Sequence, residues 1–347
     1  MTDCDGIGVK NETWVLTDGS VGMENQGLAV AEAVGLPIVT KRVRRTGPWR
    51  HLPTSWQLFV PPATRLKDID PKGDPLSPPW PRLVISVGRH SVPLALALRQ
   101  MSGGKTFAVH IQNPKVPLAC FDLVTAPLHD GLKDGAVVTT LGAPHRVTAA
   151  RLKAEGDEFA RAIADLPHPR VTVLLGGNSK AFRFEAAEAH ALADDLQKLH
   201  AKTGCSFLVT PSRRTGETVT NILREALKAT PSTVWDGSGT NPYFGYLALA
   251  DAVIATSDSV NMVTEAAGTG KPVYVYPLPG KSRRFAEFHA EMERVGATRP
   301  FVRALEQGLA SWHYTPINDT ARVAEAIKAR MAARDEAPSS GVVGSAA

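Results

Sequence analysis

The chain lacks the cysteine patterns and the long apolar runs that define several protein classes. It has three cysteines in 347 residues, Cys4, Cys120 and Cys205, without a Cys-x-x-Cys or a Cys/His cluster. We therefore expect no disulfide framework and no bound metal, and a reducing compartment is the default. No apolar run approaches the ~20 residues of a membrane span, and the first residues carry no basic-then-apolar signal sequence. We expect a cytoplasmic protein, with peripheral attachment to the inner face of a membrane as the alternative.

Common catalytic motifs are also missing. There is no G-x-G-x-x-G, no Walker A sequence, and no Ser/His/Asp order with a nucleophile elbow, so hydrolase chemistry is disfavoured. Net charge is only +5, from 39 basic and 34 acidic residues. This balance suits phosphate-bearing ligands or an anionic membrane surface and is no nucleic-acid signature. The composition, 43% hydrophobic and 21% charged, is that of a globular protein, and the length suggests two domains.

Short apolar runs alternate with helical patterns along most of the chain. This alternation predicts an α/β fold of doubly wound sheets with a ligand-binding edge. The expected strands are 13–17, 36–39, 83–87, 106–111, 121–125, 171–175, 206–210, 233–235, 252–256 and 273–276. We predict an N-terminal domain at 1–150, a second domain at 165–312, a helix at 315–333 that packs back on the first domain, and a disordered tail at 334–347.

The stretch 251–276 reads as a complete βαβ unit. A buried strand ends at Ser257-Asp258-Ser259, which suits a loop and a helix N-cap. A helix follows, and Gly268, Gly270 and Pro272 end it before the next strand. The polar loop falls at the carboxyl end of the sheet, where α/β folds bind ligands. Glu265 lies one and a half turns into the helix and can still face that edge.

Two further loops follow strands in the second half of the chain. Gly176-Gly177-Asn178-Ser179 lacks side chains at the glycines, so its N–H groups can approach a phosphate. Ser212-Arg213-Arg214-Thr215 offers two guanidinium forks to a diphosphate. Each loop alone is equally compatible with an ordinary turn or a salt-bridged loop, and Glu265 alone with a solvated helix residue. Together they predict a nucleotide site, with phosphates on the loops and ribose hydroxyls on Glu265.

Residues 41–65 contain six basic residues and no acidic one. Trp49, Trp56, Leu58 and Phe59 are interleaved with them. One interpretation is a solvated loop whose aromatic side chains tuck into the core. The other is an interfacial patch, in which basic side chains attract anionic lipid while Trp and Phe enter the headgroup region. Nucleic acid is a third and weaker option.

The first half offers several acid/base groups but no clear catalytic base. These groups are Asp18, Glu24, His90, His110, His129 and Asp130. Any of them could serve as a general base if it faced the substrate. We favour Asp18 and Asp130 because both follow strand ends.

Several motifs together resemble the ELM1 family of mitochondrial-fission-type proteins over roughly residues 13–300. They are Thr17-Asp18-Gly19, Ser86-Val87-Gly88-Arg89, Phe121-Asp122-Leu123-Val124, Ser212-Arg213-Arg214-Thr215, and Thr256-Ser257-Asp258-Ser259-Val260-Asn261-Met262 followed by Glu265-Ala266 and Thr269-Gly270-Lys271-Pro272. The family is similar to GT-B glycosyltransferases, which implies two Rossmann-like domains facing a cleft, with the nucleotide-sugar donor held mainly by the second. The loop after the first strand has no His, so the resemblance supplies no catalytic base.

The resulting prediction is a metal-independent glycosyltransferase-like protein. Its donor substrate would be a nucleotide-diphosphate sugar, with no other cofactor, and its acceptor a membrane lipid or cell-envelope molecule. No nucleic-acid partner is expected. Asp18 and Asp130 are the predicted catalytic residues. The predicted nucleotide-binding residues are Gly176, Gly177, Asn178, Ser212, Arg213, Arg214, Thr215, Asn241, Ser257, Asp258, Ser259, Met262 and Glu265. The alternatives are a non-enzymatic membrane adaptor, as the plant members of the family suggest, and a nucleotide-sugar epimerase.

Overall fold

The computed structural model describes residues 8–47, 51–67, 69–70 and 72–336. The chain divides into two compact units. The first domain runs to Thr140 and resumes at Asp319, and the second domain is Leu141–Asn318. The sequence prediction put the end of the first domain at residue 150 and the start of the second at 165. In the structure the second domain therefore includes the helix that begins at Ala149.

The first domain is a parallel six-stranded sheet in the order β2-β1-β3-β4-β5-β6. Its strands are β1 (Val9–Thr17), β2 (Ile38–Arg42), β3 (Trp80–Val87), β4 (Phe107–Ile111), β5 (Leu123–Pro127) and β6 (Val137–Thr140). Its α-helices are α1 (Val21–Val34), α2 (Pro62–Arg65), α3 (Val92–Met101) and α11 (Asp319–Glu336). Single 3₁₀ turns are η2 (Trp56–Phe59), η3 (Leu118–Cys120) and η4 (Leu128–Asp130). The order reverses between β1 and β3, which makes that point the switch of this sheet.

The second domain repeats the plan with the order β12-β11-β10-β7-β8-β9. Its strands are β7 (Arg170–Leu175), β8 (Ser206–Pro211), β9 (Ser232–Val234), β10 (Ala252–Thr256), β11 (Val273–Tyr276) and β12 (Thr298–Pro300). Its helices are α4 (Ala149–Phe159), η5 (Ala160–Ile163), α5 (Ala186–Thr203), α6 (Glu217–Ala226), α7 (Tyr243–Leu249), α8 (Val260–Ala267), α9 (Arg283–Arg294) and α10 (Val302–Gln307). Counted from its first strand, the order is that of a dinucleotide-binding Rossmann sheet, with the switch point between β7 and β10.

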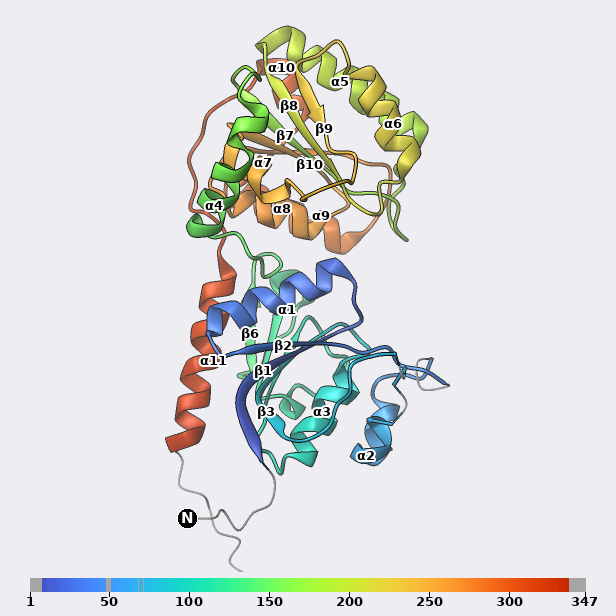
Figure 1. Ribbon diagram of the computed structural model, residues 1–347, viewed down its shortest axis with the longest axis vertical. Coiled ribbons are helices and arrows are strands. Elements are labelled where there is room, and N and C mark those ends of the chain that lie inside the picture. Colours follow the sequence, from blue (N-terminus) through green and yellow to red (C-terminus); the bar gives the residue numbers. More distant parts are fainter. Residues whose placement is uncertain (1–7, 48–50, 68, 71, 337–347) are drawn as a thin grey trace, which may run out of the picture. The chain divides into compact units, whose positions relative to one another are not determined.

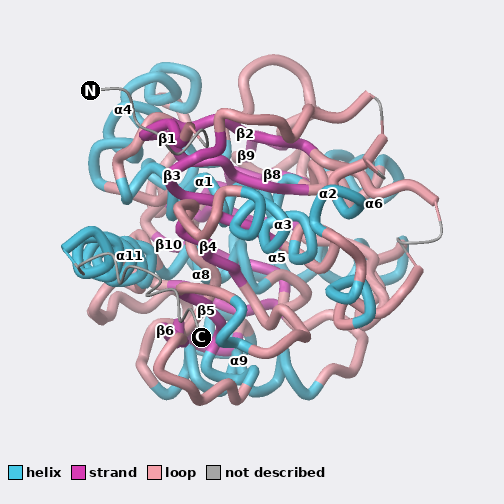
Figure 2. Tube along the Cα trace, turned by 90° about the horizontal axis from the view of Figure 1, so that it is seen from below, coloured by secondary structure: helices cyan, strands magenta, loops and turns pink. Residues whose placement is uncertain are grey.

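Helices cover both faces of each sheet (Figures 1 and 2). The strand residues alternate between the two faces, as a pleated strand requires. In β7, for example, Val171, Val173 and Leu175 pack with α5 and α6, whereas Leu174 packs with α7, α8 and α9 on the other face. Because both faces of the central strands are buried, strands such as β4 and β10 read as nearly continuous apolar runs. The α/β prediction with doubly wound parallel sheets is confirmed.

Strands β10 and β11 have the predicted bounds and pair in parallel around α8. The sequence prediction missed β6, β12 and α10, which are three to six residues long. It also assigned residues 334–336 to a disordered tail, whereas they form the last turn of α11. The rest of that tail, 337–347, lies outside the described residues.

Candidate functional site

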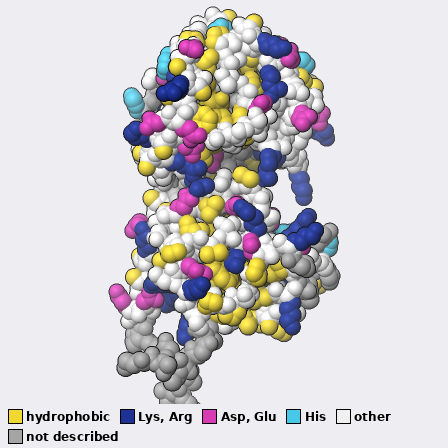
Figure 3. All heavy atoms as spheres, in the orientation of Figure 1, with side chains coloured by type: hydrophobic (Ala, Val, Ile, Leu, Met, Phe, Trp, Pro, Cys, Tyr) yellow, Lys and Arg dark blue, Asp and Glu magenta, His cyan; other side chains and the backbone are white. Residues whose placement is uncertain are grey.

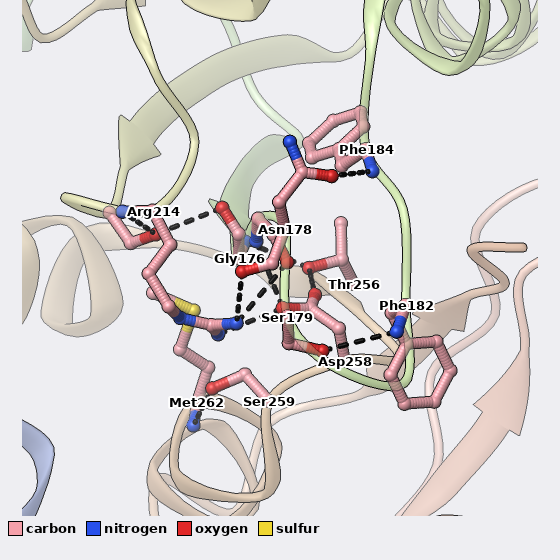
Figure 4. Close-up of polar contacts among 12 residues, drawn as sticks. Gly176, Asn178, Ser179, Phe182, Phe184, Arg214, Thr256, Asp258, Ser259 and Met262 are labelled. Carbon is pink, nitrogen blue, oxygen red and sulfur yellow. Dashed lines mark hydrogen bonds and ion pairs between the residues drawn. The ribbon is translucent and has the colours of Figure 1, made fainter. Parts of the chain in front are cut away.

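Three loops of the second domain meet at the switch point of its sheet. Because all six strands are parallel, the loops after β7, β8 and β10 leave the same edge. Strand β7 pairs with β8 on one side and with β10 on the other. The predicted Gly176, Arg213 and Ser257 loops are therefore neighbours, and Figure 4 shows the polar contacts that join them.

Asp258 is the centre of these contacts. Its side chain is fully buried. The Gly177 N–H donates to Oδ2 at 2.9 Å, and Arg214 Nη2 donates to the same oxygen at 2.8 Å. The Thr256 hydroxyl donates to Oδ1 at 2.6 Å, while the Gly176 N–H donates to Thr256 Oγ1 at 2.8 Å. The backbone N–H of Gly177 and the guanidinium of Arg214, both predicted to contact phosphate, are thus engaged by a carboxylate of the protein itself.

The two glycines are required by this packing. A Cβ on Gly176 would meet Asp258 Oδ1 at 2.0 Å, and a Cβ on Gly177 would meet the Arg214 carbonyl oxygen at 2.0 Å. Real Cβ atoms do not approach that closely, so any side chain would separate the loops. The sequence prediction attributed these glycines to phosphate approach, but in the structure they allow the three loops to pack against one another.

Hydroxyl groups complete the junction between the β7 and β8 loops. Ser212 Oγ donates to the Gly176 carbonyl at 2.9 Å. Thr215 Oγ1 donates to the Leu175 carbonyl at 3.0 Å and also contacts the Gly176 carbonyl. Ser212 and Thr215 therefore hold the backbone of the β7 loop, and their hydroxyls are occupied within the protein.

Arg213 behaves differently from its neighbour Arg214. Its side chain is exposed and has no hydrogen-bond or ion-pair partner among the residues that the structure describes. Ser259 caps α8 by accepting the Met262 N–H at 3.3 Å, and the N-terminus of this helix adds a partial positive charge beside Asp258. Arg213 and this helix end are the groups of the edge best suited to an anionic ligand.

The other predicted residues of this domain have local structural contacts. The Asn178 side chain accepts the Phe184 N–H at 2.8 Å, and Ser257 Oγ accepts the Leu278 N–H at 2.9 Å. Asn241 Oδ1 accepts the Tyr243 N–H at 3.0 Å at the start of α7. These contacts fix the loops, so any ligand contact of these residues would be an additional role.

Glu265 is buried on α8 and faces α7. It is 8% exposed, and the Tyr243 hydroxyl donates to its Oε2 at 2.5 Å. Burial raises the pKa of Glu265 to about 7, against the lowering effects of the Tyr243 hydrogen bond and of the positive charges on Arg151 and Arg146. A carboxyl group that titrates near neutral pH at the ligand edge of a domain is a functional candidate.

Two residues beside these loops, Tyr243 and His289, were not predicted from the sequence. His289 Nε2 bonds the Ser257 carbonyl at 2.8 Å from α9, and its Nδ1 is buried without a hydrogen-bond partner among the described residues. Burial lowers the pKa of His289, which favours the neutral ring. No sequence pattern identifies His289. Tyr243 carried a signal, since a tyrosine in the first turn of a buried helix needs a partner for its hydroxyl.

In the first domain the structure excludes two of the candidate general bases, His110 and Glu24. His110 is 1% exposed, and its Nδ1 lies 2.8 Å from Ser86 Oγ. Burial lowers the pKa of His110 to about 3, so this ring is a neutral core residue. Glu24 is paired with Arg42 at 2.7 Å. Neither side chain is placed to act as a general base.

Asp18 and Asp130 follow different, non-adjacent strands. Asp18 is exposed after β1, where its Oδ1 accepts the Ser20 N–H at 2.9 Å. Asp130 ends η4 after β5, with its side chain 7% exposed and its Oδ1 4.0 Å from His129 Nε2. Strands β3 and β4 lie between β1 and β5. The two strand ends are therefore about 14 Å apart in the sheet, and the carboxylates are separate candidates rather than a pair.

The segment 41–65 is partly a core element and partly an exposed aromatic turn. Arg45 and Arg65 are 4% and 2% exposed, so they are not available to a membrane. Arg65 instead anchors the segment by donating to the Val60 carbonyl at 3.0 Å. Trp49 and Arg50 lie outside the described residues.

In the same segment, Trp56 and Phe59 on η2 are 63% and 89% exposed. Sequence analysis left open whether these aromatic side chains tuck into the core, and for these two the structure excludes it. Figure 3 shows apolar and basic side chains interspersed on one face of the first domain. No helix among the described residues has the length and apolar character needed to cross a bilayer.

Comparisons with known proteins agree with the resemblance seen in the sequence. The family model "Mitochondrial fission ELM1" matches residues 21–331. The mitochondrial fission protein ELM1 of Arabidopsis thaliana is 33% identical over 279 residues, which cover 73% of this chain. The chain spans 65% of the length of that relative.

Among solved structures, a UDP-GlcNAc 2-epimerase of Methanocaldococcus jannaschii has a TM-score of 0.56 at 12% identity, over 92% of this chain and 98% of that one. The Neisseria meningitidis UDP-GlcNAc 2-epimerase, solved bound to UDP-GlcNAc, has a TM-score of 0.54 at 12% identity, over 93% and 99% of the two chains. At this identity the likeness establishes the GT-B-like fold and nothing about the reaction.

Proposed function

The chain belongs to the mitochondrial fission ELM1 family, and from this premise we propose that it binds a nucleotide-diphosphate sugar as a glycosyltransferase-like protein. The observation that carries the proposal is the meeting of the three loops at the switch point of the second sheet. In open α/β sheets this is the place where ligands bind. The solved structures of this fold include an epimerase bound to UDP-GlcNAc, which supports the same class of ligand.

In the proposed site, Asp258 organises the loops and other groups contact the nucleotide. Arg213 holds the diphosphate, because its exposed guanidinium has no ion-pair partner among the described residues, and the remaining N–H groups at the start of α8 assist it. Glu265 accepts hydrogen bonds from the ribose hydroxyls. When the sugar is transferred, negative charge develops on the leaving diphosphate, and Arg213 and the helix dipole stabilise it. The site uses no other cofactor in this proposal.

The first domain supplies the acceptor side of the reaction. Asp18 or Asp130 deprotonates an acceptor hydroxyl, which then attacks the anomeric carbon of the donor sugar. Asp18 is the more accessible of the two, whereas Asp130 has a histidine ring beside it. The acceptor class that we propose is a membrane lipid or cell-envelope molecule, because of the basic aromatic segment in the same domain.

Calorimetry with UDP, GDP and their sugars tests the proposal directly. We expect binding of at least one nucleotide, weakened by about 1–3 kcal/mol in Glu265→Ala, where the ribose loses a charged hydrogen-bond partner. Arg224→Ala, a change on α6 outside the three loops, is the control and should bind as the wild type does. If none of these ligands binds at millimolar concentration, the proposal is wrong.

A second candidate function is a membrane-associated adaptor on the same fold. The exposed Trp56 and Phe59 on one short turn favour it, because tryptophan and phenylalanine beside basic side chains bind the interface of anionic bilayers. Gln57, between them, is buried and donates to the Leu52 carbonyl at 3.0 Å, so the turn is anchored. An epimerase of nucleotide sugars, the third possibility from sequence, would need the same nucleotide site.

Co-sedimentation with vesicles of anionic and neutral lipid separates these functions. We expect binding to anionic vesicles that falls when Trp56→Ser and Phe59→Ser are combined, and that weakens with salt. Val302→Ser is the matched control, since Val302 is 52% exposed on a different domain. Membrane binding without any nucleotide affinity would favour the adaptor function. Nucleotide affinity without membrane binding would exclude the adaptor function.

A further inference from the structure

We propose that Tyr243 is a positioning residue of the nucleotide site: its hydroxyl holds one oxygen of the Glu265 carboxylate and orients the other for the ribose. This inference rests on the proposed nucleotide binding and assigns a role to a residue that none of the sequence motifs contains. Tyr243 does not contact the ligand in this scheme. It acts through Glu265.

The first support is the contact itself. The phenol oxygen lies 2.5 Å from Glu265 Oε2, and the carboxyl-bearing residue is only 8% exposed. A hydrogen bond from a neutral donor to a carboxylate is strong and directional, more so where water is excluded. The hydrogen bond from Tyr243 therefore fixes both the rotamer of Glu265 and the orientation of its carboxylate plane.

The second support is that α7, which carries Tyr243, is held at both ends. At its start, Asn241 accepts the Tyr243 N–H. In its last turn, the carbonyls of Leu247 and Ala248 accept hydrogen bonds from the Lys271 ammonium at 2.7 and 2.5 Å. Lys271 belongs to the Gly-Lys-Pro motif of the sequence analysis, and this contact gives it a structural role as the C-terminal brace of α7.

The helix is also fixed along its side. A Cβ on Gly245 would meet the Phe159 ring at 2.5 Å, so α4 and α7 are in direct contact there. The Arg151 guanidinium stacks on the Phe244 ring at 4.0 Å and bonds Glu155 at 2.8 Å. Tyr243 therefore presents its hydroxyl to Glu265 from a rigid support.

The consequence is an effect of pH on ligand affinity. The groups that act on Glu265 are the Tyr243 phenol from α7, Arg151 from α4 and Arg146 from the segment before α4, and each lowers its pKa against the effect of burial. His145 packs beside Gly268 at the end of α8. The ionised carboxylate is an acceptor at both oxygens, whereas protonation turns one oxygen into a donor and weakens the group as an acceptor for the ribose hydroxyls. Nucleotide affinity should therefore fall as pH drops through the pKa of Glu265, and removing the phenol should move that fall to higher pH.

The test is UDP affinity by calorimetry between pH 5.5 and 9 for the wild type and Tyr243→Phe. We expect the variant to bind UDP more weakly throughout this range, because Glu265 loses its orientation, and its midpoint to be raised by about one to two pH units. Tyr276→Phe is the matched control, because the Tyr276 hydroxyl also donates to a carboxylate, Asp195 Oδ2 at 3.3 Å, elsewhere in the domain. It should leave the midpoint unchanged. A wild-type midpoint retained in Tyr243→Phe overturns the inference.

A second measurement separates this inference from the proposed function. The carboxyl titration of Glu265 can be followed in the ligand-free protein by ¹³C NMR, assigned by its absence in Glu265→Gln. Tyr243→Phe should raise the pKa of that carboxyl, and an unchanged value would overturn the coupling even in a folded variant. Failure of the wild type to bind UDP or any other nucleotide would instead count against the proposed function, and with it the ribose role of Glu265.

Discussion

At the scale of single residues, the most informative side chain is Asp258. It brings an anion of the protein to the point where the β7, β8 and β10 loops meet, and three donors converge on it. A phosphate at the same place would be repelled by the carboxylate. The two neighbouring arginines therefore have different tasks, which the sequence Arg213-Arg214 alone does not distinguish.

Replacing each arginine by alanine should separate those tasks. Arg214→Ala removes the cation that faces a buried carboxylate and should destabilise the second domain by about 1–2 kcal/mol, since the guanidinium is partly exposed. Arg213→Ala should leave the melting temperature unchanged and weaken nucleotide binding. Thermal denaturation and calorimetry on the same two variants check this. The opposite assignment, with Arg213→Ala alone lowering the melting temperature, would contradict it.

Glu265 should also leave a signature in the pH dependence of stability. Its pKa is raised from 4.5 to about 7 in the folded chain, so between these values the native state binds more protons than the unfolded state. The contribution of Glu265 to the free energy of unfolding is therefore greatest below pH 4.5 and is lost as pH rises to about 7. Glu265→Gln should abolish this component, on the order of 3 kcal/mol. Chemical denaturation at pH 5 and pH 8 measures it, and identical pH slopes for both proteins would refute it.

At the scale of elements, the sequence predicted the central strands of the second sheet closely but missed one edge strand of each sheet. Strands β7, β8 and β10 are buried on both faces, so their apolar runs are continuous and their bounds were predicted within one residue. The edge strands β6 and β12 are short and half-exposed. Neither contains an apolar run that distinguishes it from a loop, and both were missed.

For the candidate site, the positions of the loops could be predicted from the sequence, but the contacts between them could not. The three loops could be predicted because each follows a central strand, and parallel strands bring their carboxyl ends to one edge. Their internal contacts could not, because the partner of a polar side chain depends on distant residues. Gly177 and Asp258 are 81 positions apart, and no local pattern indicates that they bond each other.

The C-terminal helix α11 offers a test at this scale. Its residues Val323, Ile327 and Met331 are buried with Val30 and Ile85 in one cluster of the first domain. Ile327→Ala should cost about 2–4 kcal/mol through lost burial and a residual cavity. Lys328→Ala, on the exposed side of the same helix, should change stability by less than about 0.5 kcal/mol. Urea denaturation of both variants checks the difference, and equal effects would show that α11 adds little to this core.

At the scale of the whole molecule, the chain carries two complete doubly wound sheets with different strand orders. The second has the Rossmann order and its switch point at β7 and β10, where the polar loops gather. The first has its switch point at β1 and β3. Each domain thus has a switch point of the kind at which α/β folds bind ligands, which suits the proposed reaction between two substrates.

Hydrogen exchange should show which domain receives the nucleotide. With UDP at 100 times its dissociation constant, amides of the loops 176–179, 212–215 and 257–262 should exchange more slowly, by up to about 2.7 kcal/mol in opening free energy. Amides of the first-domain sheet should be unaffected by UDP alone. Mass-spectrometric exchange with and without UDP measures this, and protection confined to the first domain would reverse the assignment of donor and acceptor sides.

The return of α11 to the first domain has a consequence for synthesis on the ribosome. The sheet of the first domain is complete at Thr140, yet the helix that covers Val30 and Ile85 begins only at Asp319. The whole second domain, Leu141–Asn318, must be translated in between, which takes roughly 10–40 s at ordinary elongation rates. During that interval the nascent first domain exposes the apolar strip that α11 covers in the folded protein. Chaperone binding to ribosome-bound chains should therefore persist until α11 has emerged, long after the first sheet has been made.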